Sequence, residues 1–127
     1  MIEEKYKSII DEYIKAYNCF DIDKMVENFC EDVVFINVSD NHMNLSCDGI
    51  EKYKDISYYA KSIFEARHLE PVHYKQEHNR VFVDIEFEGI ISKDLSDEFK
   101  TGDELLLCGT TIFEFSEDKI SVLLDFS

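Results

Sequence analysis

Long apolar runs and basic residues are both scarce in this sequence of 127 residues. The longest apolar runs, such as 105–108 and 122–124, are far shorter than the ~20 residues that a membrane-spanning helix needs. Lys and Arg number 13 against 28 Asp and Glu, which gives a formal net charge of −15 at pH 7. Because this charge repels phosphate groups and the lysines form no stripe, we expect no nucleic-acid partner and no membrane partner.

Cysteine is also sparse, and Cys19, Cys30, Cys47 and Cys108 lie 11, 17 and 61 residues apart. This spacing matches neither a metal-binding pair nor a dense disulfide framework, so we expect free and mostly buried thiols. The four histidines are not spaced to converge on one metal ion, and no glycine-rich phosphate loop is present. We therefore expect no metal and no cofactor. The first residues lack the pattern of a secretory signal, which predicts a cytoplasmic protein.

With one proline and four glycines, few positions interrupt the chain, and its 45% hydrophobic content is enough for one packed domain over residues 1–127. Apolar residues three and four apart predict a first helix that ends near Asn18. Asp21 is suited to cap a short second helix. Asp48 and Glu51 form a capping-box pattern, which predicts a third helix whose apolar stripe reaches Phe64.

The strands are expected between and after these helices. Residues 33–38 are β-branched and aromatic, which predicts a strand between the second and third helices. After Pro71 the apolar residues alternate with polar ones, which predicts a hairpin with one solvated face that turns at His78 and Asn79. Two further strands are expected, from Glu104 to Phe115 and from residue 120 to 126. The order α-α-β-α-β-β-β-β predicts the α+β class, with three helices packed on a curved antiparallel sheet.

Several short segments occur in a familiar order along almost the whole chain. They are Tyr13 to Tyr17, Phe20 to Met25, Val34 to Asn37, Asp48 to Ile50, Phe64 to Arg67, and Gly109 to Phe115. In this order the chain resembles the nuclear transport factor 2-like superfamily, within its SnoaL-like and ketosteroid-isomerase-like branch. The resemblance implies a cone-shaped fold whose helices and concave sheet face enclose an apolar pocket, and dimers that form through the outer sheet face.

The pattern of apolar residues favours a dimer independently of this resemblance. Both faces of the predicted strand from Glu104 to Phe115 are largely apolar. A strand that is apolar on both faces is normally covered on both, because an exposed patch of this kind is a liability for a soluble monomer. We therefore expect the outer sheet face to form a homodimer interface.

The resemblance can be tested against the catalytic residues of ketosteroid isomerase, which uses an Asp general base and an oxyanion hole of Tyr and protonated Asp. It places the oxyanion Tyr at Tyr13, the general base at Asn37 and the protonated Asp at Thr111. Asn cannot hold a proton at neutral pH, and Thr is a weaker donor than a neutral carboxylic acid. We therefore do not expect the ketosteroid-isomerase mechanism from these residues.

Asp125 is the best candidate for a different acid or base. It shares a strand face with Leu123 and Ser127, and it lies near the position where the resemblance puts pocket residues. If it faces inward, its apolar neighbours raise its pKa by desolvation. The alternative is a solvated side chain near the end of the chain. We predict Asp125 and Tyr13 as the catalytic residues.

A second set of residues is predicted to bind the ligand. Asn37 can orient a ligand or bond a neighbouring Tyr, and Tyr17 can reach the pocket or belong to the core. Arg67 either pairs with Glu65 or Glu70, or clamps a ligand carboxylate. The predicted ligand-binding residues are Asn37, Thr111, Tyr17, Phe35, Phe64, Arg67 and Phe113.

Two functions remain open at this point. In the first, the pocket binds a small apolar molecule and the protein acts as a cofactor-free isomerase, lyase or hydrolase by acid–base chemistry. In the second, the fold is a binding or dimerisation module without chemistry. A cavity that holds a titratable group with a perturbed pKa would favour the first. A cone filled by Phe35, Phe64, Phe113 and Met43 would favour the second.

Overall fold

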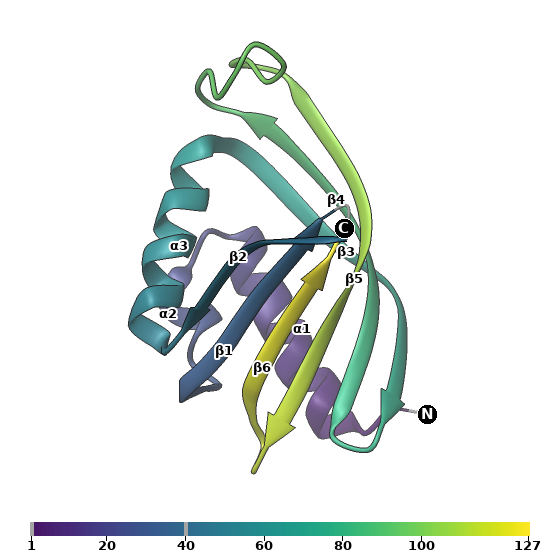
Figure 1. Ribbon diagram of the computed structural model, residues 1–127. Helices are drawn as coiled ribbons and strands as arrows, with labels where there is room; N and C mark the ends of the chain where they lie inside the picture. The colour runs from purple at the N-terminus through teal and green to yellow at the C-terminus, as the bar shows by residue number, and fades with distance from the viewer. Residues whose placement is uncertain (1, 40) are drawn as a thin grey trace.

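The structure, a computed structural model, describes residues 2–39 and 41–127, which form three helices and six strands (Figure 1). The strands make a single sheet in the order β2-β1-β6-β5-β4-β3. It curls around α1, while α3 lies alongside the β2 edge (Figure 1). The elements are α1 (Glu4–Asn18), α2 (Ile22–Met25), β1 (Phe29–Ser39), β2 (His42–Asp48), α3 (Ile50–Ile63), β3 (Phe64–Glu77), β4 (Arg80–Ile91), β5 (Glu104–Ser116) and β6 (Lys119–Phe126).

The α+β class and the curved sheet are confirmed, and the structure corrects several details. Strand β2 was not predicted, and its side chains are almost all exposed, so they carry no alternating pattern. Strands β1 and β6 run parallel, whereas the other neighbouring strands are antiparallel. Helix α3 is capped by Gly49 at a φ of 96°, not by Asp48, which belongs to β2.

The third helix also ends one residue earlier than its apolar stripe indicated. Phe64 already has extended backbone and begins β3, so the segment Phe64 to Arg67 is strand. Pro71 lies within β3 at an irregularity in the pairing with β4. Since β3 is an edge strand, the missing N–H of Pro71 costs little pairing.

The core lies between α1 and the concave face of the sheet. In β4 the buried and exposed residues alternate as predicted, with Val83 and Ile85 buried and Asp84 and Glu86 exposed. The largest fully buried side chains come from α1 and from four strands. They are Phe113, Ile10, Ile91, Ile120, Leu123, Val33, Val81 and Val83.

Gly109 allows the end of β6 to pass close to β5. A Cβ atom at this position would overlap the carbonyl oxygen of Phe126. The N–H of Ser127 then donates to the carbonyl of Val38 at 3.0 Å, which ties the same segment to β1. Residues 125–127 are therefore held between β1 and β5.

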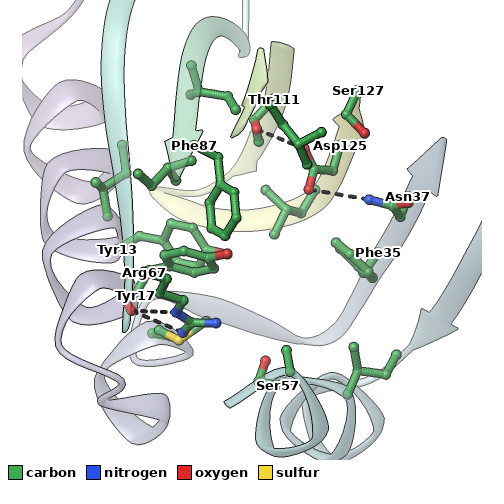
Figure 2. A pocket seen from close by; sticks show the side chains of 18 of the residues that line it. Tyr13, Tyr17, Phe35, Asn37, Ser57, Arg67, Phe87, Thr111, Asp125 and Ser127 are labelled. Atoms are coloured by element: carbon green, nitrogen blue, oxygen red, sulfur yellow. Dashed lines mark hydrogen bonds between the residues drawn. The ribbon is translucent and has the colours of Figure 1, made fainter. Parts of the chain in front are cut away.

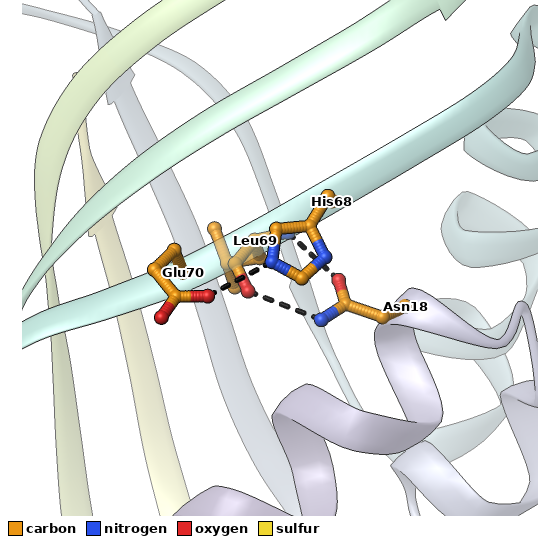
Figure 3. Close-up of polar contacts among 4 residues, drawn as sticks. All are labelled: Asn18, His68, Leu69 and Glu70. Atoms are coloured by element: carbon orange, nitrogen blue, oxygen red, sulfur yellow. Dashed lines mark hydrogen bonds and ion pairs between the residues drawn. The ribbon is translucent and has the colours of Figure 1, made fainter.

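A side-chain clamp joins the end of α1 to the edge of the sheet. The N–H of Leu69 donates to Oδ1 of Asn18 at 2.7 Å, and Nδ2 of Asn18 donates to the carbonyl of Leu69 at 3.1 Å (Figure 3). Beside it, Nε2 of His68 lies 2.9 Å from a carboxylate oxygen of Glu70 in an exposed hydrogen bond (Figure 3). The Asn18 amide thus satisfies two backbone groups of an edge strand that no further strand covers.

The predictions for the cysteines and for membrane-spanning helices can be compared with the structure. The four thiols are free, as expected, but they are not mostly buried, because Cys19 and Cys108 are exposed and Cys30 and Cys47 are half-buried. No helix within residues 2–39 and 41–127 is long and apolar enough to cross a membrane.

We predict that Asn18→Ala lowers the free energy of unfolding by about 1–3 kcal/mol, because two backbone groups of β3 lose their partner. Urea denaturation followed by circular dichroism measures this change. Asn28→Ala is the control, since the side chain of Asn28 makes one exposed hydrogen bond, to Glu12, and the bond that its backbone carbonyl accepts from Ile120 is kept in the variant. We expect it to cost less than 0.5 kcal/mol, roughly the range of surface substitutions. Equal effects of the two substitutions would contradict the clamp.

Candidate functional site

A cavity of about 270 Å³ lies between the concave face of the sheet and helices α1 and α3. Its wall is mostly apolar, with a few polar side chains (Figure 2). The structure brings every residue predicted for the site to this one wall. From α1 these are Tyr13 and Tyr17, from β1 Phe35 and Asn37, from β3 Phe64 and Arg67, from β5 Thr111 and Phe113, and from β6 Asp125.

Asp125 is held at the cavity by its two neighbours in the sheet. The strand register places Asn37 of β1 on one side of it and Thr111 of β5 on the other. Oγ1 of Thr111 donates to Oδ1 of Asp125 at 3.2 Å, and Nδ2 of Asn37 donates to Oδ2 at 3.4 Å (Figure 2). Asn44 of β2 donates to Oδ1 of Asn37 at 3.5 Å, which fixes the orientation of the Asn37 amide.

Burial in this apolar cavity raises the pKa of Asp125 above its ordinary value. The hydrogen bonds from Thr111 and Asn37 act in the opposite direction, because they favour the charged carboxylate. Desolvation is the largest of these effects. A carboxyl group of this kind exchanges its proton closer to neutral pH than an exposed aspartate does, which suits it to general acid–base chemistry.

Tyr13 forms a hydroxyl pair with Tyr53 of α3. The two hydroxyl oxygens are 2.6 Å apart, and both side chains are buried. Burial raises the pKa of both groups, so both stay protonated. The two hydroxyl groups carry two protons, and one of these is used in the hydrogen bond between them. The other proton can be donated to a third group. Tyr53 was part of the predicted apolar stripe, but the stripe gave no sign that its hydroxyl would meet that of Tyr13.

Arg67 pairs with neither Glu65 nor Glu70, which corrects the first of its two predicted roles. Glu65 is exposed, and Glu70 pairs with His68 instead. The Nε and Nη2 atoms of Arg67 donate to the backbone carbonyl of Tyr17 at 3.1 and 3.0 Å. Arg67 is only 7% exposed, although it is charged.

Aromatic rings form much of the remaining wall. Phe35 and Phe113 are buried, and Phe64 packs edge-on against Phe87 with ring centroids 5.4 Å apart. Met43 is 64% exposed on β2 and does not line the cavity, so the filled cone that would favour a module without chemistry is not found in the form described above. Sequence reasoning missed several lining residues, which are Leu45, Tyr53, Ser57, Phe87, Leu105 and Leu107.

Within the part of the chain that the structure describes, no three His, Cys, Asp or Glu side chains gather in a way that could hold a metal ion. The polar groups that line the cavity are the carboxyl of Asp125, the guanidinium of Arg67 and neutral hydroxyl and amide groups.

One protein-family model matches this chain, and many solved structures have a similar fold. The family model described as "SnoaL-like domain" matches residues 10–123. No curated protein matches the chain. A proposed polyketide cyclase from Xanthomonas campestris pv. campestris has a TM-score of 0.84 at 16% identity, over 98% of this chain and 90% of that one.

Two further solved structures illustrate the range of named activities on this fold. A proposed SnoaL-like polyketide cyclase from Jannaschia sp. CCS1 has a TM-score of 0.83 at 15% identity, over 98% of this chain and 86% of that one. An LEH-like epoxide hydrolase from M. tuberculosis has a TM-score of 0.75 at 12% identity, over 96% of this chain and 81% of that one. At these identities the likeness concerns the fold alone.

We predict that Thr111→Val raises the pKa of Asp125 further, because the substitution removes a hydrogen bond that favours the charged form. A carbon-13 NMR titration of the side-chain carboxyl groups measures it, with Asp125 assigned from the Asp125→Asn spectrum. Thr110→Val is the matched control, since Thr110 donates to the exposed Asp84 on the outer face. A pKa of Asp125 that falls or stays constant in Thr111→Val would contradict the described geometry.

Proposed function

This chain belongs to the SnoaL-like domain family, and from that premise we propose that it binds a small, largely apolar molecule in the cavity and exchanges a proton with it through Asp125. The observation that supports this most directly is a carboxyl group with a raised pKa at the wall of an apolar cavity. Such a combination is typical of general acids and bases. Similar folds named as polyketide cyclases and an epoxide hydrolase are compatible with it.

In this proposal Asp125 acts as a base when ionised and as an acid when protonated. The carboxylate takes a proton from a carbon or oxygen atom of the bound molecule, and the resulting carboxylic acid returns a proton to the molecule. Asn37 and Thr111 hold the carboxylate in place during both steps. The Tyr13–Tyr53 pair offers one hydroxyl proton to negative charge that develops on the molecule. This scheme needs no cofactor and fits an isomerase as it stands. A lyase adds the departure of a leaving group from the deprotonated molecule, and a hydrolase requires Asp125 to take the proton from a water molecule that then attacks the bound molecule.

The alternative, a binding or dimerisation module without chemistry, keeps the cavity and removes the proton transfer. It is less well supported, because a module of this kind has no use for a partly buried carboxyl group with two hydrogen-bond donors around it. The two functions differ in one measurable property, which is whether the protein accelerates proton exchange in a molecule that it binds.

A bicyclic ketone with acidic C–H bonds, 2-tetralone, is a suitable probe of this property. We predict that the protein accelerates exchange of its C1 protons for deuterium in D₂O near pH 7, followed by proton NMR. Asp125→Asn should slow the exchange at least ~10-fold, because an amide cannot accept the proton, and general-base catalysis contributes about 10²–10⁴-fold. Binding of 2-tetralone, followed by calorimetry, should change little.

The matched control is Asp84→Asn, because Asp84 also accepts a hydrogen bond from a threonine of β5 but lies on the exposed face. It should exchange protons at the wild-type rate. If the wild-type protein exchanges protons no faster than the same concentration of acetate, the proposal of proton transfer is wrong and the module without chemistry is favoured.

We also propose a homodimer through the outer face of the sheet. Four half-buried apolar side chains stand in register across neighbouring strands of this face, in the row Ile36, Leu124, Ile112 and Phe82. Polar pairs flank this row, an ion pair between Arg80 and Glu114 on one side and a hydrogen bond between Thr110 and Asp84 on the other. An apolar centre with a polar rim fits a second copy of the chain.

We predict that Ile112→Glu converts the dimer into a monomer, because it places a charge in the centre of the apolar row. Sedimentation equilibrium at micromolar concentration measures the mass of each variant against 14.9 kDa for one chain. Val72→Glu is the control, since Val72 is an exposed apolar residue of β3 outside the row. A wild-type protein that already sediments as a monomer would refute the interface.

A further inference from the structure

Arg67 is a buried cation that has no acidic partner within residues 2–39 and 41–127. It is 7% exposed, and no carboxylate of the described residues lies within ion-pair distance of its guanidinium. The guanidinium stacks on two rings, 3.7 Å from the ring centre of Tyr17 and 4.4 Å from that of Phe20. These contacts compensate only part of the cost of burying a charge. A charged side chain in this setting is normally paired, so its partner is to be sought in the cavity.

The hydrogen bonds of Arg67 leave one edge of the guanidinium open. Nε and Nη2, which form one side edge of the planar guanidinium, both donate to the carbonyl of Tyr17. Among the described residues, no carbonyl or carboxylate accepts a hydrogen bond from the end edge, which is formed by Nη1 and the second proton of Nη2. Its polar neighbour is the neutral hydroxyl of Tyr17, whose pKa burial raises and the guanidinium lowers. Figure 2 shows this end of Arg67 directed away from the Tyr17 carbonyl and into the pocket. Two parallel N–H groups on one edge match the two oxygens of a carboxylate.

Arg67 and Asp125 lie on opposite sides of the pocket (Figure 2). The rest of the wall consists largely of aromatic and aliphatic side chains, including Phe87 and Leu105. A molecule that satisfies the whole cavity therefore has an anionic group at one end, an apolar ring body, and a proton-exchanging atom at the other end.

We propose that Arg67 binds a carboxylate of the ligand, so that the cavity selects planar apolar acids over neutral molecules of the same shape. The inference rests on the proposed function, because it assigns a ligand class to the same cavity. The general field of the protein does not supply such a preference, since a net charge of −15 repels anions. A preference for an anion must therefore come from a local group.

Two probes of equal size test this proposal, 2-naphthoate and its neutral carboxamide, 2-naphthamide. Calorimetric titration at 150 mM salt should give the wild-type protein a Kd for 2-naphthoate at least ~10-fold lower than that for 2-naphthamide, as a charge-assisted bidentate pair implies. Arg67→Gln should abolish this difference while 2-naphthamide binds within about twofold of wild type. Arg67→Lys should keep part of the preference, because it keeps the charge but loses the planar fork.

Arg80→Gln is the matched control, because Arg80 is the other arginine of the chain and lies exposed in its ion pair with Glu114. It changes the net charge by the same amount and should keep the full preference. Binding of 2-naphthamide to Arg67→Gln also reports that this variant is folded.

The outcomes separate this inference from the proposed function. Equal affinity of the wild-type protein for both probes would overturn the assignment of a carboxylate to Arg67 and leave the cavity as a binding site. A preference for 2-naphthoate that survives in Arg67→Gln would overturn it as well. If neither probe binds the wild-type protein, both the ligand class and the proposed binding function fail.

Discussion

The contact between the end of α1 and strand β3 is the interaction on which the cavity depends. Two consecutive residues of α1 make it, since the carbonyl of Tyr17 accepts from Arg67 and the amide of Asn18 binds the backbone of Leu69. Because β3 is an edge strand, it has a sheet neighbour on one side only, and α1 supplies the partner on the other. The same contact positions Arg67. The hydrogen bonds that attach α1 to β3 therefore also fix the place of the buried guanidinium.

The opposite side of the cavity depends on strand register. Asp125 is aligned with Asn37 in the parallel neighbour β1 and with Thr111 in the antiparallel neighbour β5. Because side chains alternate between the two faces of a strand, a slip of one residue in β6 would turn Asp125 to the outer face and Leu124 into the cavity. Gly109 helps to fix this register, since only a residue without a Cβ allows Phe126 to approach β5 so closely.

Sequence predicts those helices and strands in which the spacing of apolar residues shows which face is buried. Helix α1 and strand β4 each bury one face, and their periods of 3–4 and 2 residues were sufficient. Strand β2 buries almost nothing and exists because β1 offers it a partner, so no local pattern announced it. The single domain over residues 1–127 and the cytoplasmic location stay predictions.

The same distinction applies to the site. Asp125 and Asn37 stood out as polar residues in apolar strands, which is a signal that a sequence can carry. The partner of Arg67 is a backbone carbonyl, which every residue has, so its identity depended on the packing of α1 against β3. The hydroxyl pair likewise joins Tyr13 of α1 to Tyr53 of α3, two residues that are 40 positions apart in the sequence.

Asp125 of β6 and Arg67 of β3 lie on opposite sides of the cavity (Figure 2), and this separation bears on how one fold serves several activities. The pKa of Asp125 is raised by burial and lowered by Thr111 and Asn37, and Arg67 is not among the groups that shift it. A change at the Arg67 end can therefore alter which molecule binds without altering the acidity of Asp125. Proteins of similar fold carry names as different as polyketide cyclase and epoxide hydrolase. Under the proposed role of Arg67, substitutions in β3 would change the ligand class while substitutions in β1, β5 and β6 would change the acidity of Asp125, all within one fold.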